Sequence, residues 1–96
     1  MSAPAAAWRV AVPGEAIEVG VVLERATSAP LDVLFVCAHG AGSHMDHPEM
    51  LATSAALRDA GFDVVRFNFP YRERGSGRPD RMPVLMRCVA SVAAHI

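Results

Sequence analysis

The sequence predicts an α/β fold, in which an antiparallel hairpin is followed by a parallel strand-helix-strand-helix unit. The first observation is a wholly apolar run at 33–38, whose length and branched and aromatic content are typical of a strand buried on both faces. The second is a helical pattern at 48–60, which separates that run from another apolar run at 62–69. A strand, a helix and a strand in this order form a right-handed unit with parallel strands.

Two shorter strands are expected before that unit. Residues 1–7 form a loose Ala/Pro lead, and the weak alternation at 8–12 predicts a first strand. The Pro-Gly-Glu stretch at 13–15 is a turn signal, and β-branched residues alternate along 17–24. We therefore expect the two strands to pair as an antiparallel hairpin, followed by a polar loop at 26–32.

The helix at 48–60 carries its own start and stop signals. Pro48 suits the first turn, where a backbone N–H has no partner in any helix, and Glu49 favours the positive end of the helix dipole. Gly61 is placed as the residue after the C-cap, where a left-handed backbone is common.

A Gly- and Arg-rich loop is expected at 71–79, before a second helix. Asp80 can cap that helix, and Pro83 is tolerated in its first turn. The helix presents one apolar face at helical spacing, made up of Leu85, Cys88, Val89, Val92 and Ile96.

Composition indicates one small domain over residues 1–96. With a formal net charge of −1, the chain lacks the concentrated basic face that nucleic-acid and membrane-surface proteins need. Cys37 and Cys88 lie in apolar surroundings without CxxC spacing, which indicates reduced thiols and a cytoplasmic protein. The amino terminus lacks the features of a secretory signal, and no apolar run approaches the ~20 residues of a membrane span.

The run at 33–38 ends in His39-Gly40-Ala41-Gly42, and this stretch is the strongest candidate site. Two glycines around one small residue let the backbone turn sharply and approach another group closely. The N–H groups freed in such a turn can point together at a negative charge. Because open α/β sheets bind ligands at the carboxyl ends of their strands, we expect the main chain to stabilise an anion or oxyanion here.

Three motifs together resemble a known family. They are AHGAG at 38–42, VRFNFPY at 65–71 and RPDR at 78–81. Their order and spacing resemble the first half of an α/β hydrolase. Within that family they resemble the group that includes the hydrolase-like domain of the third subunit of the NSL histone acetyltransferase complex, its testis-expressed relative, and compact bacterial dienelactone-hydrolase relatives. The resemblance covers roughly 17–96 and implies the amino-terminal portion of an α/β-hydrolase fold.

The resemblance implies an oxyanion hole built partly from this loop. Its first donor would be the N–H of Ala41, with Gly42 as the second candidate. His39 and Gly40 would shape the loop without transferring protons. The other donor would follow the nucleophile on a G-x-S-x-G elbow. No cofactor is implied.

The nucleophile itself is not expected in this chain. The elbow needs small residues on both sides of its serine so that the strained turn can form, and Ser76 has arginines at the outer positions. Ser43 lacks the same frame, while Ser54 and Ser91 fall inside expected helices. The family's catalytic acid and histidine come later still, so the chain alone is predicted to be inactive.

The family's strand order places the fourth strand between the second and the third. The run at 33–38 would then form an apolar edge strand, which invites pairing with another chain. We therefore expect a truncated fragment, a single partial domain with an incomplete sheet. Its partner would be a complementing carboxyl-terminal half, or a second copy that associates through the exposed strand.

The loop at 71–79 lies at the same end of the sheet as the glycine turn, so Tyr71 and Arg72 are candidates to line a substrate pocket. Its arginines could also form an anion-binding patch. Because acidic residues are interspersed among them, a solvated loop with local ion pairs is favoured.

A metal site is the first alternative. His44, Asp46 and His47 nearly complete the H-x-H-x-D-H pattern of metallo-β-lactamase-like hydrolases, but Gly42 replaces the first histidine and one ligand is missing. A polar loop before a helix is the favoured interpretation. A Rossmann-type nucleotide site is less favoured still, since Met45 takes the third glycine position and no acidic residue ends the next strand.

The favoured function is the amino-terminal part of a small serine hydrolase that acts on a small-molecule ester, thioester or lactone-like acyl substrate. A non-catalytic hydrolase-fold scaffold or interaction module is the alternative. A metal-dependent hydrolase is less favoured than either.

Overall fold

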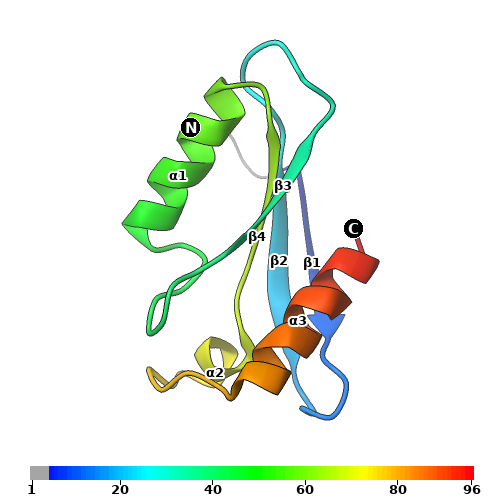
Figure 1. The fold of residues 1–96 in the computed structure, drawn as a ribbon, viewed down its shortest axis with the longest axis vertical. Helices are drawn as coiled ribbons and strands as arrows, with labels where there is room; N and C mark the ends of the chain where they lie inside the picture. The colour runs from blue at the N-terminus through cyan, green and yellow to red at the C-terminus, as the bar shows by residue number, and fades with distance from the viewer. Residues whose placement is uncertain (1–4) are drawn as a thin grey trace.

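Four strands and three helices make up residues 5–96, the part of the chain that the computed structural model describes (Figure 1). They follow one another as β1 (Ala6–Ala11), β2 (Glu18–Glu24), β3 (Leu34–Ala38), α1 (Pro48–Asp59), β4 (Asp63–Phe67), α2 (Pro70–Glu73) and α3 (Met82–Ala94). The prediction of a loose lead at 1–7 is partly wrong, because Ala6 and Ala7 belong to β1 and pair with residues of β2. Its residues 1–4 lie outside the described part.

The strands described form one mixed sheet in the order β1-β2-β4-β3. β1 pairs antiparallel with β2, as expected of the hairpin. β4 pairs antiparallel with β2 and parallel with β3, so it lies between them. The predicted hairpin, the parallel unit and the placement of β4 between β2 and β3 are all confirmed.

The two faces of the sheet are covered differently (Figure 1). Because side chains alternate along a strand, Val65 and Phe67 point to one face while Val64 and Arg66 point to the other. The first face carries the hydrophobic core, which consists of Val10, Val12, Val19, Val21, Val65, Phe67, Phe69, Tyr71, Cys88 and Val92. On the second face α1 packs against β4 and contributes the buried Ser54. The apolar core therefore lies on the α3 side of the sheet.

β3 is an edge strand of the sheet within the described residues, as the family's strand order predicted. Its side chains Leu34, Phe35 and Val36 are exposed by 37–44%. The prediction that the run at 33–38 is buried on both faces is therefore wrong. Apolar side chains favour burial, but β3 has a neighbouring strand on one side alone in the described residues, so its side chains stay partly open to water.

The stretch after β4 differs from its prediction. The loop expected at 71–79 begins with the short helix α2. Asp80 does not cap α3, because its carboxylate accepts the Tyr71 N–H at 2.9 Å, and the N-cap residue is Arg81 without a side-chain cap bond. Pro83 lies in the first turn of α3 as expected.

α1 begins and ends as its signals predicted. Pro48 opens the helix, and the N-cap residue His47 accepts the Glu49 N–H on its Nδ1 at 3.1 Å. Gly61 follows the C-cap with a φ of +105°, and a Cβ there would lie 2.6 Å from the Ala29 carbonyl oxygen. Only glycine fits that turn without movement of the neighbouring loop.

α3 turns only part of its predicted apolar face toward the core. Cys88 and Val92 are fully buried, whereas Val89 and Ile96 are exposed. Within residues 5–96, none of the helices has the length and apolar character needed to span a membrane.

Candidate functional site

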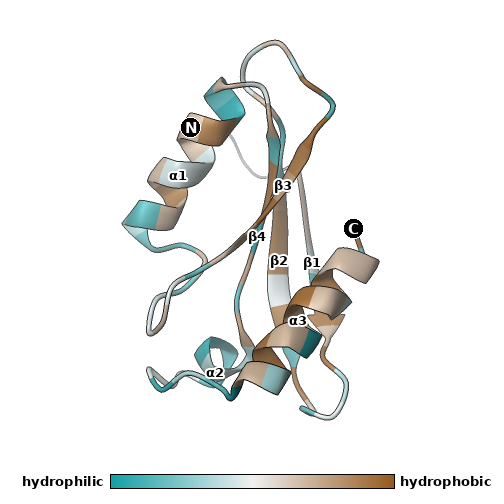
Figure 2. Cartoon of the chain, in the orientation of Figure 1, coloured by the Kyte–Doolittle hydropathy of each residue, from teal (hydrophilic) through white to brown (hydrophobic). Residues whose placement is uncertain are grey.

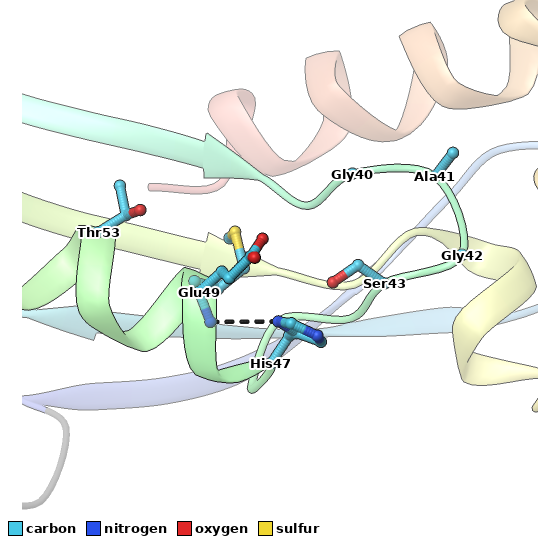
Figure 3. Close-up of a pocket in the computed structure, with 8 residues that line it drawn as sticks. Gly40, Ala41, Gly42, Ser43, His47, Glu49 and Thr53 are labelled. Atoms are coloured by element: carbon cyan, nitrogen blue, oxygen red, sulfur yellow. Dashed lines mark hydrogen bonds between the residues drawn. The ribbon is translucent and has the colours of Figure 1, made fainter.

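A cleft lies beside the glycine turn that follows β3 (Figure 3). The cleft has a volume of about 470 Å³. Its lining consists of Gly40, Ala41, Gly42, Ser43, His47, Glu49, Met50 and Thr53. The turn supplies mainly backbone to this cleft, and α1 with its N-cap supplies side chains. The predicted turn therefore borders an open space near the carboxyl end of β3.

His39 holds the start of the loop and is buried, with 5% of its surface exposed. Its Nε2 accepts the Phe69 N–H at 3.2 Å, so the ring proton sits on Nδ1, which donates to the Gly40 carbonyl at 2.9 Å. Burial lowers the pKa of His39, and the nearby charge of Arg72 acts in the same direction. Both ring nitrogens are occupied, which is the arrangement expected of a residue that shapes the loop and does not transfer protons.

The two candidate oxyanion donors differ in their surroundings. The Gly42 N–H donates to the Tyr71 hydroxyl at 3.0 Å. By contrast, the Ala41 N–H donates to no group within residues 5–96, and Ala41 lines the cleft. An N–H that already has a partner must give it up before it binds a ligand, so Ala41 is the better placed donor.

The far end of the loop is held by β4 and the residues after it. The Met45 N–H donates to Asn68 Oδ1 at 2.8 Å, and the Met45 carbonyl accepts from Arg66 Nη1. Arg66 Nη1 also donates to the Asp46 carboxylate at 2.9 Å. Together with the bonds described above, these contacts tie the whole loop to one segment at 66–71.

Arg66 is buried, and its charge is balanced by Glu24 of β2. Its Nε donates to Glu24 Oε1 at 2.8 Å, while Arg58 of α1 donates to Glu24 Oε2 at 3.2 Å. The Ser54 hydroxyl donates to Glu24 Oε1 at 3.1 Å. A buried guanidinium is stable only when paired, so this network fixes α1 against the sheet. Sequence reasoning missed the roles of Arg66 and Asn68, although polar residues within an apolar run were the available signal.

His44, Asp46 and His47 do not gather into a metal site. Across residues 5–96, no three His, Cys, Asp or Glu side chains come close enough to hold one ion. The rings of His44 and His47 lie 5.8 Å apart, each Nδ1 accepts a local N–H, and Asp46 pairs with Arg66. These residues build the turn and the cap that lead into α1.

Two of the loop arginines have partners, one within the loop and one far away in the sequence. Arg72 Nη1 donates to the Ser76 carbonyl at 3.0 Å, and Arg74 pairs with Glu15 at 3.3 Å. Tyr71 and Arg72 do not line the cleft beside the glycine turn. Their expected place in a substrate pocket stays a prediction.

Both cysteines are free thiols. Burial raises the pKa of Cys37, and it raises the pKa of Cys88 to about 12. The Cys88 Sγ also donates to the Asn68 carbonyl at 3.7 Å. Because the thiolate is the reactive form, neither residue has the character of an activated nucleophile.

Comparison with known proteins gives a family and a structural relative. A model of the alpha/beta hydrolase domain matches residues 31–96. No curated protein matches the chain significantly. Among solved structures, an alpha-beta serine hydrolase homologue from Coxiella burnetii matches with a TM-score of 0.78 and 19% identity, over 99% of this chain and 46% of that chain. The chain shares the fold of that structure and spans less than half of its length.

Proposed function

Because the chain belongs to the alpha/beta hydrolase domain family, we propose that it supplies the amino-terminal half of a small serine hydrolase and one side of its oxyanion hole. The substrate is a small ester, thioester or lactone-like acyl compound. The serine that attacks it lies outside residues 1–96, because no serine in this chain has the frame of a nucleophile elbow.

The observation that carries this proposal is the Ala41 N–H. It is a main-chain donor without a partner in the described part of the chain, and it borders a cleft near the carboxyl end of a parallel strand. A donor held in place before the reaction stabilises the negative charge that develops on an acyl oxygen, and loss of one such donor costs about 10²–10³ in rate.

The exposed edge of β3 supports the division into two halves. β3 has one neighbouring strand in the described part of the chain, and its apolar side chains are exposed. A complementing carboxyl-terminal half would pair with this edge and cover those side chains. Pairing with a second copy of the chain is the other arrangement that would cover them.

Two finer assignments belong to the same proposal. The motifs at 38–42, 65–71 and 78–81 support the group that includes the NSL-complex subunit, its testis-expressed relative and the dienelactone-hydrolase relatives. The free thiols of Cys37 and Cys88 support a cytoplasmic setting.

The test isolates the native gene product from its source cell, measures its intact mass and treats it with a fluorophosphonate. We expect a mass about twice that of 96 residues and one covalent adduct, on a serine outside this chain. The purified chain 1–96, the matched control, should show no saturable turnover of p-nitrophenyl acetate.

Three outcomes would contradict the proposal. An adduct within residues 1–96, or turnover by the short chain that the phosphonate abolishes, would place the nucleophile here. A native product of doubled mass that takes no adduct would favour the scaffold alternative. A native mass matching 96 residues would mean that this chain is not part of a longer hydrolase, and the proposed catalysis would be dropped in favour of a partner that pairs with the edge of β3.

A further inference from the structure

Tyr71 reaches the glycine turn from the segment that follows β4. α2 begins at Pro70, three residues after the end of β4 at Phe67, and Tyr71 is its second residue. The Tyr71 hydroxyl accepts the Gly42 N–H at 3.0 Å and lies 3.5 Å from the Gly40 carbonyl oxygen. One hydroxyl therefore contacts the residues on both sides of Ala41.

The Tyr71 side chain is fixed by its own packing. It is 3% exposed, and its ring lies 5.7 Å from the His39 ring in an edge arrangement and 6.4 Å from the Phe69 ring in a stacked one. The Tyr71 N–H is also held, by the Asp80 carboxylate at 2.9 Å. A side chain restrained in this way can hold another group in position at little further entropic cost.

The Tyr71 hydroxyl does not reach the cleft. The cleft is lined by the turn, α1 and its N-cap residue, and Tyr71 is absent from that lining. The hydroxyl contacts main-chain groups of the turn, the Gly42 N–H and the Gly40 carbonyl. This separates it from residues that touch a substrate.

We propose that Tyr71 is a positioning residue of the oxyanion hole, whose hydroxyl binds Gly42 and so holds the turn that carries the Ala41 N–H in one conformation. The proposal rests on the function proposed above. Without the Tyr71 hydroxyl the Gly42 N–H is free to compete for a ligand or for water. The remaining bonds of the turn, which has a φ of +74° at Gly42, join the Gly40 carbonyl to the His39 ring and to the Ser43 N–H, and in the described residues they leave the Gly42 N–H without a partner. The Ala41 N–H would then adopt several orientations instead of one.

The first experiment measures amide hydrogen exchange in the full 96-residue chain, for wild type and Tyr71→Phe. We expect the Gly42 amide of wild type to be protected, and its exchange to rise about 5- to 10-fold in the variant, which is the size of effect that one hydrogen bond produces. The Met45 and Phe69 amides, which have other acceptors, should not change.

Two references keep the result interpretable. Exchange at Gly42 is expressed relative to Val65, which lies in β4, so a general loss of stability cancels. Ser28→Ala is the matched control, because it removes one hydroxyl that is bonded elsewhere, to Asp59 at 3.2 Å, and it should leave Gly42 unchanged. A Gly42 amide that is unprotected in wild type, or that Tyr71→Phe does not affect, would overturn the proposal.

The second experiment measures the rate of fluorophosphonate labelling and the turnover of the native gene product. Tyr71→Phe should slow labelling about 10-fold and lower kcat by a similar factor, with KM nearly unchanged, because the charge on the acyl oxygen develops only in the transition state. Equal labelling of both proteins would overturn the positioning role and leave the proposed function standing. A native product that is not labelled at all would overturn the proposed function, and with it the positioning role of Tyr71.

Discussion

β3 and β4 are neighbouring parallel strands of five residues each, and at every paired position the β4 residue is the more deeply buried. Phe35 of β3 is 44% exposed, whereas its partner Val64 is 0% exposed. The same difference holds for Val36 beside Val65. Hydropathy gives no hint of the contrast, because β3 is coloured as a hydrophobic strand throughout (Figure 2).

The difference arises from what surrounds each strand. β4 has β2 on one side and β3 on the other, α1 over one face and the apolar core over its other face. β3 has β4 on one side alone in the described residues. Two similar strands therefore contribute unequally to stability, because apolar area stabilises the fold only where the rest of the chain removes it from water.

The largest expected effect comes from truncating an aromatic side chain of β4, and the same truncation in β3 gives the comparison. Phe67→Ala in β4 should lower the free energy of unfolding by about 3–5 kcal/mol, because it leaves a cavity in the core. Phe35→Ala in β3 should cost about 1 kcal/mol, because its side chain is already partly in water. Urea unfolding of the 96-residue chain measures both. Equal losses would show that β3 is as well buried in solution as β4.

The next effect concerns the charge that β4 buries on its α1 side. Glu24→Ala should lower the free energy of unfolding by about 3 kcal/mol, because it removes the more buried of the two carboxylates that pair with Arg66 and takes the same carboxylate away from Arg58. Glu18→Ala is the matched control in the same strand, where an exposed pair with Arg9 at 3.7 Å should contribute less than about 0.5 kcal/mol. Similar losses for the two variants in urea unfolding would mean that Asp46 alone is enough to balance the charge of Arg66.

The smallest effect tests the loop that leads from β3 into α1. The pKa of His39 is lowered by burial in the folded chain, so the unfolded chain binds a proton more readily below about pH 6.5. Stability from this residue is therefore present above that pH and declines as the pH falls through the folded pKa. The charged and titratable neighbours of His39 are Arg72, His44 and Tyr71.

The measurement compares urea midpoints at pH 8 and pH 5.5 for wild type, His39→Asn and His95→Asn. Wild type and the His95 variant should lose more stability at the lower pH than the His39 variant does. If all three proteins showed the same pH dependence of stability, the proton would be taken up elsewhere in the chain.

The sequence by itself determined the order of the four strands and of α1 and α3, because their signals are local. The apolar runs, the turn at 13–15, the start of α1 at Pro48 and its stop at Gly61 each depend on residues within one or two turns of chain. The glycine turn after β3 was recognisable for the same reason. Its spacing alone indicated where main-chain donors would lie.

Only the tertiary structure decided what surrounds these elements. The contacts that hold the loop join residues far apart in the chain, from Gly42 to Tyr71 and from Met45 to Asn68, so no local pattern encodes them. The same holds for Arg66 and Glu24, which meet because β2 and β4 are neighbours. Burial is a property of the assembled sheet, and this is why an apolar strand such as β3 can be predicted from its residues while its exposure cannot.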